Sequence, residues 1–310
     1  MSRPGGKDVQ EQRQSGAAAA LLLLSGLAAL GGDGGDWRAM LAAVVAALLA
    51  WGLVIWAGRR GLNLRQSLAD SIWRWPFTVY LLLVNGWLLA ASLKMLVYWW
   101  AEAPPAWLLL LLITLVYGYS AYLGEAALKR MSVLVAAMLF FWAILDTLML
   151  LPKYDLAMLK PQGQPEPWLP LAVREALWLL APLPALLLYL PGQAPAGRRF
   201  PAAAVGTVLI AVYLILVRLR DQAVLGLLAT LNPYPLVRTL SMVSAGVGLN
   251  RVEYFGLMAL FGALFTGGML ILGAAFSVSG LKRQKYPVVH ALLWTGAQFV
   301  LAWFFYARMA

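Results

Sequence analysis

The stretch that decides the fold is NPYPLVRTLSMVSAGVGLNRVEYFGLMALFGALFTGGMLILGAAF, residues 232–276. It begins with a polar, proline-containing segment and continues through a short amphipathic segment. It ends in a long apolar run that is preceded by Arg251 and Glu253. About 20 apolar residues cross the hydrocarbon core of a bilayer as a helix. The stretch therefore predicts a transmembrane helix that starts at a charged membrane surface.

The composition extends this prediction to the whole chain. Of its 310 residues, 62% are hydrophobic and 12% are charged, and the mean hydropathy is +0.77. A soluble domain needs far more charge to cover its surface. The Leu, Ala and Val runs are continuous and do not alternate with polar residues, which excludes a transmembrane β-barrel. The expected fold class is an all-α, polytopic membrane helical bundle.

The charged and reactive residues argue against several functions. The net charge of +11 comes from basic residues between apolar runs. That placement sets membrane topology and does not indicate a nucleic-acid partner. The absence of cysteine excludes disulfides and thiolate sites, and the single histidine is His290. We expect no enzymatic activity, no metal site and no cofactor.

Hydropathy predicts nine spans and one long surface segment. Residues 1–15 are expected to form a cytoplasmic tail, and residues 218–250 are too polar to span and are expected to lie along the membrane surface. The first apolar run is short, so it also fits a cleaved signal peptide. The predicted spans cover residues 16–30, 37–57, 77–98, 106–123, 131–151, 171–190, 201–217, 252–278 and 288–306.

Three motifs resemble those of one protein family. They are Pro235 with Arg238 and Arg251-Val252-Glu253, then Gly35-Asp36-Trp37, and Asp155-Leu156 with Leu159 and Pro161. In this pattern the chain resembles the spore germination permeases, the GerAB-like B subunits of germinant receptors.

The resemblance implies a fold and a function. The family is similar to the amino acid–polyamine–organocation superfamily, which is built on two inverted five-helix repeats. Here residues 16–151 would form the first repeat and residues 152–310 a second repeat of four helices that lacks the tenth.

The implied protein senses a small nutrient, an amino acid or a sugar, in the inner membrane of a bacterial spore. It signals germination through partner A and C subunits. Two alternatives are a secondary amino-acid transporter and a membrane scaffold that binds no ligand.

The expected ligand site lies where spans are broken. Pro182 and Pro184 lack N–H groups, so the carbonyls of Trp178 and Leu180 lose their helical donors. Such carbonyls need a cavity or a protein partner. A plain kink is the alternative. By the family's repeat pattern, Ser25 and Gly26 would mark the matching break in the first span.

Two sets of charged residues are further candidates. Lys94 and Asp146 lie within predicted spans near the same side, so we expect them to pair. Asp146 could instead meet Arg218 or Arg220, or be protonated and bonded to a backbone carbonyl or to Thr147. A second set, Arg238, Arg251 and Glu253, would form a gate or a docking surface, or its side chains would simply extend to lipid headgroups.

Basic residues predict the orientation. With the N-terminus in the cytoplasm, 14 of the 24 Lys and Arg residues lie on the cytoplasmic side, most of them in short segments. Nine spans then place the C-terminus on the other side. A reporter fused after Ala310 that works only in the cytoplasm should be silent. Strong reporter activity would contradict the nine-span count.

Overall fold

The computed structural model describes residues 37–60, 67–68, 71–100, 102–123, 125–159, 173, 180–188, 202–243, 253–279 and 287–309. All regular secondary structure in these ranges is helical, which confirms the all-α prediction. The expected first span and much of the sixth lie outside the described residues.

The described helices follow the predicted spans closely. The fourth predicted span, residues 106–123, matches its helix from end to end, and most of the others differ by only a few residues. The helices are α2 (Trp37–Arg59), α4 (Arg74–Trp99), α5 (Ala106–Leu123), α6 (Glu125–Leu150), α8 (Leu183–Leu188), α9 (Ala202–Leu225), α10 (Leu228–Leu231), α11 (Pro235–Leu240), α12 (Glu253–Val278) and α13 (Pro287–Arg308).

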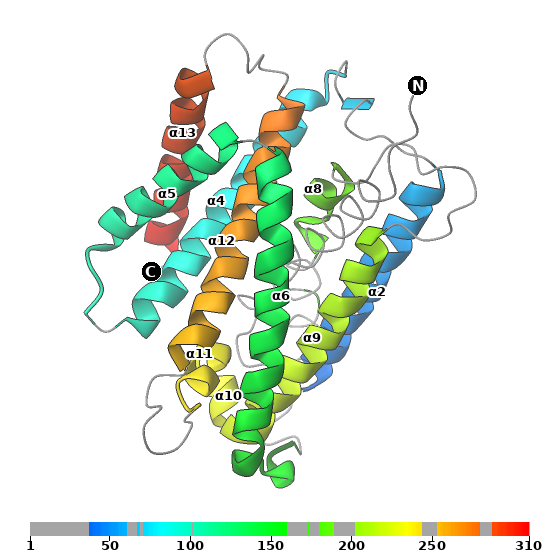
Figure 1. The fold of residues 1–310 in the computed structure, drawn as a ribbon, viewed down its shortest axis with the longest axis vertical. Helices are drawn as coiled ribbons and strands as arrows, with labels where there is room; N and C mark the ends of the chain where they lie inside the picture. The colour runs from blue at the N-terminus through cyan, green and yellow to red at the C-terminus, as the bar shows by residue number, and fades with distance from the viewer. Residues whose placement is uncertain are drawn as a thin grey trace.

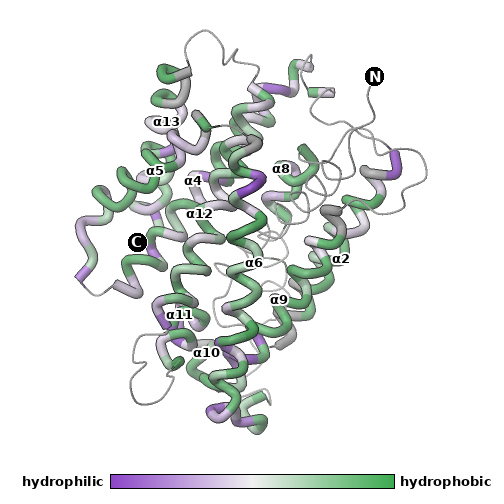
Figure 2. The backbone as a smooth tube through the Cα atoms, viewed as in Figure 1, coloured by the Kyte–Doolittle hydropathy of each residue, from purple (hydrophilic) through white to green (hydrophobic). Residues whose placement is uncertain are grey.

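Three of these helices, α4, α6 and α12, are long and apolar enough to cross a membrane. Shorter apolar stretches lie in α2 and α5. Figure 2 shows the apolar residues along the lengths of the helices, with several of the most hydrophilic ones near helix ends. Outward-facing side chains such as Leu134, Met258 and Leu293 are 60% or more exposed. Apolar surface of this kind fits a lipid environment.

The helices α4, α5, α12 and α13 pack together and form a scaffold. α4 packs against α12 and α13, and α5 packs against the same two helices (Figure 1). α12 is the centre of this group, since most of its residues are buried, including Leu264, Leu270 and Ile271 at 0% exposure.

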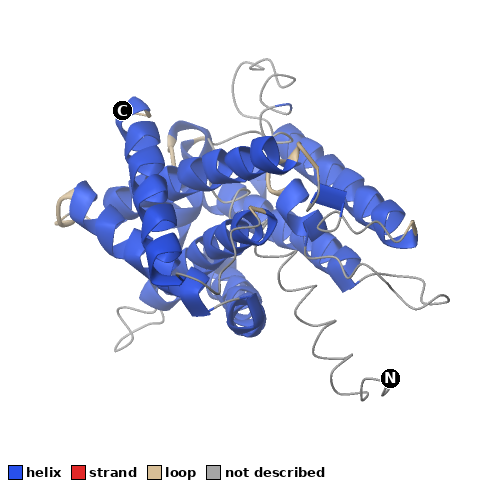
Figure 3. Ribbon diagram, turned by 90° about the horizontal axis from the view of Figure 1, so that it is seen from above, coloured by secondary structure: helices blue, strands red, loops and turns tan. Residues whose placement is uncertain are grey.

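The remaining helices pack beside the scaffold. α6 lies along α12 and also contacts α9, while α9 packs along α2. The short α8 contacts both α12 and α2. Figures 1 and 3 show the pair α2–α9 on one side of the molecule and α5 with α13 on the other.

Contacts at one end of the bundle show which ends of α4, α6, α9 and α12 lie together. The end of α4 meets the start of α12, because the rings of Trp99 and Tyr254 lie 5.4 Å apart. The end of α6 meets the end of α9, because the Asp155 N–H donates to the carbonyl of Ala223 at 3.0 Å. Gly226 then ends α9 with a φ of 55°, a left-handed conformation that favours glycine.

The expectation for residues 218–250 needs correction. α9 does not stop before Arg218 but continues through Arg220 and Asp221 to Leu225. Both of these charged side chains are buried and bonded to each other, so the helix can keep them inside the bundle. Only the later part, with α10 and α11, forms short separate helices.

A polar layer joins the scaffold helices internally. The Asn85 side-chain amide on α4 donates to Gln298 Oε1 on α13 at 3.1 Å, and both residues are 0% exposed. Gly268 of α12 lies against this layer, since an added Cβ would clash with Tyr117 Oη and lie 2.9 Å from Asn85 Oδ1. The glycine therefore provides the space for these two polar groups.

Gly268→Ala should destabilise the fold because the added methyl group displaces Tyr117 and Asn85. Overpacking of this kind costs about 1–3 kcal/mol, so a lower melting temperature in detergent is expected. Gly52→Ala on α2 is the matched control, since nothing lies within 4 Å of its added Cβ. Equal melting temperatures for the two variants would show that the polar layer tolerates the methyl group.

Candidate functional site

The sixth segment is interrupted at its prolines, as predicted. Leu180 is helical, a turn follows at Ala181 and Pro182, and α8 begins at Leu183. Pro182 is buried and Pro184 is half-buried, so the interruption lies inside the bundle. The structure thus contains a helix break against α12 and α2.

A tyrosine on α4 holds this break. The Tyr80 hydroxyl donates to the backbone carbonyl of Ala181 at 2.8 Å. The prolines predicted that the carbonyls of Trp178 and Leu180 lack helical donors, whereas the carbonyl that Tyr80 bonds is that of Ala181. The bond ties the break to the scaffold, so Tyr80 positions the broken segment.

The other expected ligand residues can be placed only in part. Ser25, Gly26 and Trp178 lie outside the described residues, and Leu180 is half-buried beside the turn. The matching break in the first span therefore stays a prediction.

Lys94 and Asp146 do not form the expected ion pair. Lys94 Nζ donates to the carbonyl of Met309 at the end of α13 and lies 5.9 Å from the centre of the Tyr306 ring. Asp146 faces another direction: a Cβ on Gly256 of α12 would lie 2.6 Å from its Oδ2. The two residues lie near the same end of the bundle, but their side chains point to different neighbours.

Asp146 instead belongs to a buried charge cluster, which we define as Asp146, Arg220 and Asp221. They are 2%, 1% and 2% exposed, respectively. Arg220 bonds one oxygen of its neighbour on α9, since Nε and Nη2 lie 3.1 and 2.9 Å from Asp221 Oδ1. Within the part of the chain that the structure describes, Asp146 Oδ1 and Asp221 Oδ2 have no hydrogen-bond partner.

A small cavity lies within the charge cluster. Its volume is about 10 Å³, close to the least that admits one water molecule. Asp146 on α6, Arg220 and Tyr213 on α9 and Gly256 on α12 contribute to its wall, which is otherwise apolar. Charged groups inside a membrane protein face the bundle interior and mark functional sites by default.

Of the expected gate residues, only Arg238 and Glu253 can be placed. Arg238 is exposed on α11, Glu253 is half-buried in the first turn of α12, and Arg251 lies outside the described residues. Nearby, the Tyr98 hydroxyl donates to Asn232 Oδ1 at 3.2 Å, which ties the end of α4 to the segment before α11.

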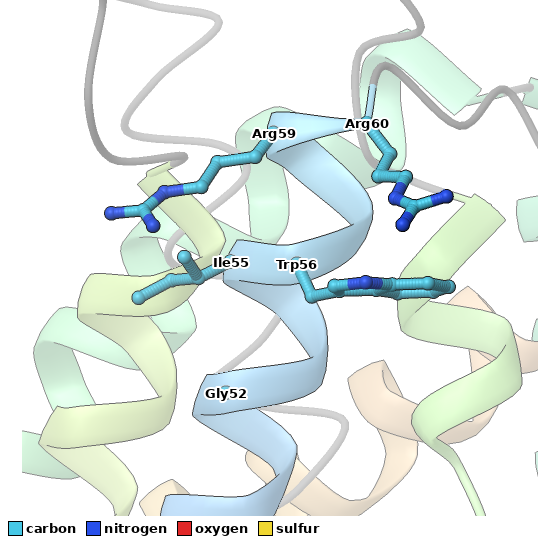
Figure 4. A pocket seen from close by; sticks show the side chains of 5 residues that line it. All are labelled: Gly52, Ile55, Trp56, Arg59 and Arg60. Atoms are coloured by element: carbon cyan, nitrogen blue, oxygen red, sulfur yellow. The ribbon is translucent and has the colours of Figure 1, made fainter.

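A larger hollow is found at the end of α2. It has a volume of about 560 Å³ and is lined by Gly52, Ile55, Trp56, Arg59 and Arg60. Arg60 lies over the Trp56 ring at 5.4 Å, and Figure 4 shows Arg59 pointing to the other side of the helix. Arginine and tryptophan in this arrangement are typical of a membrane interface. Since the two guanidinium groups diverge, the hollow does not offer a convergent ligand site.

Sequence comparisons give no relative: no family model and no curated protein matches the chain. Among solved structures, the chain is similar to Mhp1, a nucleobase-cation-symport-1 family transporter in a closed conformation with bromovinylhydantoin bound. The match has a TM-score of 0.56 at 13% identity and covers 96% of this chain and 71% of Mhp1. At that identity the likeness establishes the fold.

The chain is therefore an all-helical membrane protein whose fold is similar to that of this transporter.

Tyr80→Phe should weaken the attachment of the broken segment because it removes the bond to Ala181. Loss of one hydrogen bond costs about 0.5–1.5 kcal/mol, so a small fall in melting temperature is expected, with faster proteolysis near residue 181. Tyr119→Phe is the control, since Tyr119 is 61% exposed on α5 and makes no hydrogen bond with the described residues. If the two variants behave alike, Tyr80 does not hold the break.

Proposed function

We propose that the chain is the B subunit of a spore germinant receptor. In this proposal it binds a small nutrient, an amino acid or a sugar, in the inner membrane of a bacterial spore. It signals through A and C partner subunits. The observation that carries the proposal is the interrupted sixth segment, attached to a transporter-type scaffold through Tyr80. The motif residues Pro235, Arg238 and Glu253 support the germinant-receptor assignment.

The proposed ligand site is the break itself. At a proline-broken helix, backbone carbonyls lack helical donors and can bond a ligand. The apolar surroundings, with Leu183 and Leu186 buried, strengthen such bonds because water is excluded. No acidic residue lies in α8, so the ligand would be recognised mainly by backbone groups and shape.

Signalling would arise from a shift between two arrangements. Ligand stabilises the arrangement of α8 against α12 and α2 that it binds better. A 100-fold preference for one arrangement supplies about 2.7 kcal/mol, enough to change which arrangement dominates. The partner subunits would then detect the arrangement of the helices, and transport would not be required.

A secondary transporter is the second candidate, and the fold favours it because Mhp1 is a transporter. Proteoliposomes that contain only this chain separate the two functions. The receptor predicts saturable binding of an amino acid or sugar without accumulation inside the vesicle, whereas the transporter predicts accumulation. A chain that binds none of the L-amino acids and hexoses tested, but assembles with partner subunits, would be the non-binding scaffold.

Pro182→Ala combined with Pro184→Ala should abolish the ligand response while keeping the fold. Alanine restores two helical N–H donors, and proline inside a helix costs about 3 kcal/mol, so stability should stay constant or rise. The measurement is thermal stabilisation by a panel of L-amino acids and hexoses. The double variant Pro104→Ala, Pro105→Ala, in the turn before α5, is the control and should respond like the unmodified chain. A normal response from the Pro182 and Pro184 variant would show that the break is only a kink.

A further inference from the structure

The charge cluster contains one guanidinium group and two carboxylates that compete for it. Arg220 is bonded to Asp221, the next residue of the same helix, and only through one of its two oxygens. Asp146, on the facing helix α6, borders the same cavity as Arg220, and its Oδ1 has no hydrogen-bond partner among the described residues. Arg220 therefore forms its hydrogen bonds within α9, while Asp146 Oδ1 on α6 has no hydrogen-bond partner among the described residues.

The charge cluster leaves buried carboxylate oxygens without hydrogen bonds to the described residues, which costs free energy. A buried carboxylate without a hydrogen-bonding partner is costly in a low-dielectric interior. The bond that is made does not connect helices, since Arg220 and Asp221 belong to α9 alone. A bond to Asp146 would connect α9 to α6, and both side chains border the same small cavity.

If Arg220 leaves Asp221, the Asp221 carboxylate keeps a favourable electrostatic interaction with another arginine. The charge of Arg218, three residues earlier on α9, also acts on Asp221. Arg220 is the only positively charged residue among those that line the cavity beside Asp146. In the structure Asp221 has one bonded oxygen and one without a partner among the described residues. A bond from Arg220 to Asp146 would therefore exchange one partly satisfied carboxylate for another.

We propose that Arg220 is a two-position latch between α9 and α6. In the structure Arg220 is held by Asp221, and the small cavity lies beside Asp146 of α6 and Arg220 of α9. In the second position Arg220 binds Asp146, the cavity closes and the two helix ends are drawn together. Gly256 allows this movement because it places no side chain against Asp146.

The latch is independent of the proposed function in that it needs neither a nutrient nor partner subunits. It lies at the helix ends that surround α11 and the start of α12, whereas the proposed ligand site lies at α8. A movement of α9 would be transmitted to α2, along which it packs, and α2 contacts α8. The two regions are thus joined by direct helix contacts.

The test uses spin labels on the purified full chain, which has no cysteine of its own. Leu148→Cys on α6 and Leu219→Cys on α9 are suitable sites, since these side chains are 56% and 39% exposed. The distance distribution between the labels is measured in the unmodified background and in two carboxylate variants. Asp221→Asn should shift the distribution toward shorter distances, because Arg220 is released to Asp146. Asp146→Asn should shift it toward longer distances, because the second position is lost.

Lys94→Met is the matched control, because Lys94 is a partly buried charge near the same end of the bundle whose contacts are Met309 and Tyr306. It should leave the distribution unchanged. A distribution that neither carboxylate variant moves, or that both move in the same direction, would overturn the latch.

A second measurement requires no change at Asp221. The Arg220 Nε–H resonance, assigned by its loss in Arg220→Lys, should report exchange between two environments in the unmodified chain and one environment in Asp146→Asn. A resonance that is identical in both chains would overturn the latch as well.

Discussion

Water is absent from the hydrocarbon core of a bilayer, so each buried polar group in a membrane-spanning chain needs a partner from the chain itself. Most of the buried hydroxyl groups in the described residues bond a carbonyl of their own helix, such as Ser92 with Leu88 and Thr239 with Pro235. A few longer side chains bond across helices and so join one helix to another. Asn85 and Gln298 join α4 to α13, and Tyr80 joins α4 to the segment before α8. α4 therefore makes polar bonds on two sides, one within the scaffold and one to the broken segment.

Close packing completes the scaffold where polar bonds are few. Apolar side chains gain little by leaving lipid for another helix, so membrane helices associate through shape and through small residues. A Cβ on Gly86 of α4 would lie 3.0 Å from Leu301 Cβ of α13, and Gly268 of α12 gives way to Tyr117 of α5. The scaffold is fixed by these contacts, whereas the charge cluster leaves two carboxylate oxygens without bonds. The closely packed scaffold can keep its framework while the charge cluster, whose hydrogen bonds lie within α9, rearranges.

The sequence predicted the spans well because the length of an apolar run and its flanking prolines and charges determine a helix directly. It failed at α9, which continues eight residues beyond the predicted end. Hydropathy counts Arg220 and Asp221 as two charges, but in the structure they neutralise each other. Pro182 and Pro184 revealed the broken helix because their effect is local, whereas Tyr80 lies 101 residues from its partner Ala181. Depth in the membrane correctly placed Lys94 and Asp146 near one end, but depth does not say which way a side chain points around its helix.

The hydrogen bond between Asp155 and Ala223 changes how the segment after α6 should be understood. Leu151–Lys153 and Leu156–Leu159 form two short 3₁₀ turns, and Met158 packs over Gly226 at the end of α9. These nine residues thus form a cap on α9 and are not a passive connection. Their length sets the separation between the ends of α6 and α9. Insertions or deletions here would change the bundle geometry even though the segment lies near the surface.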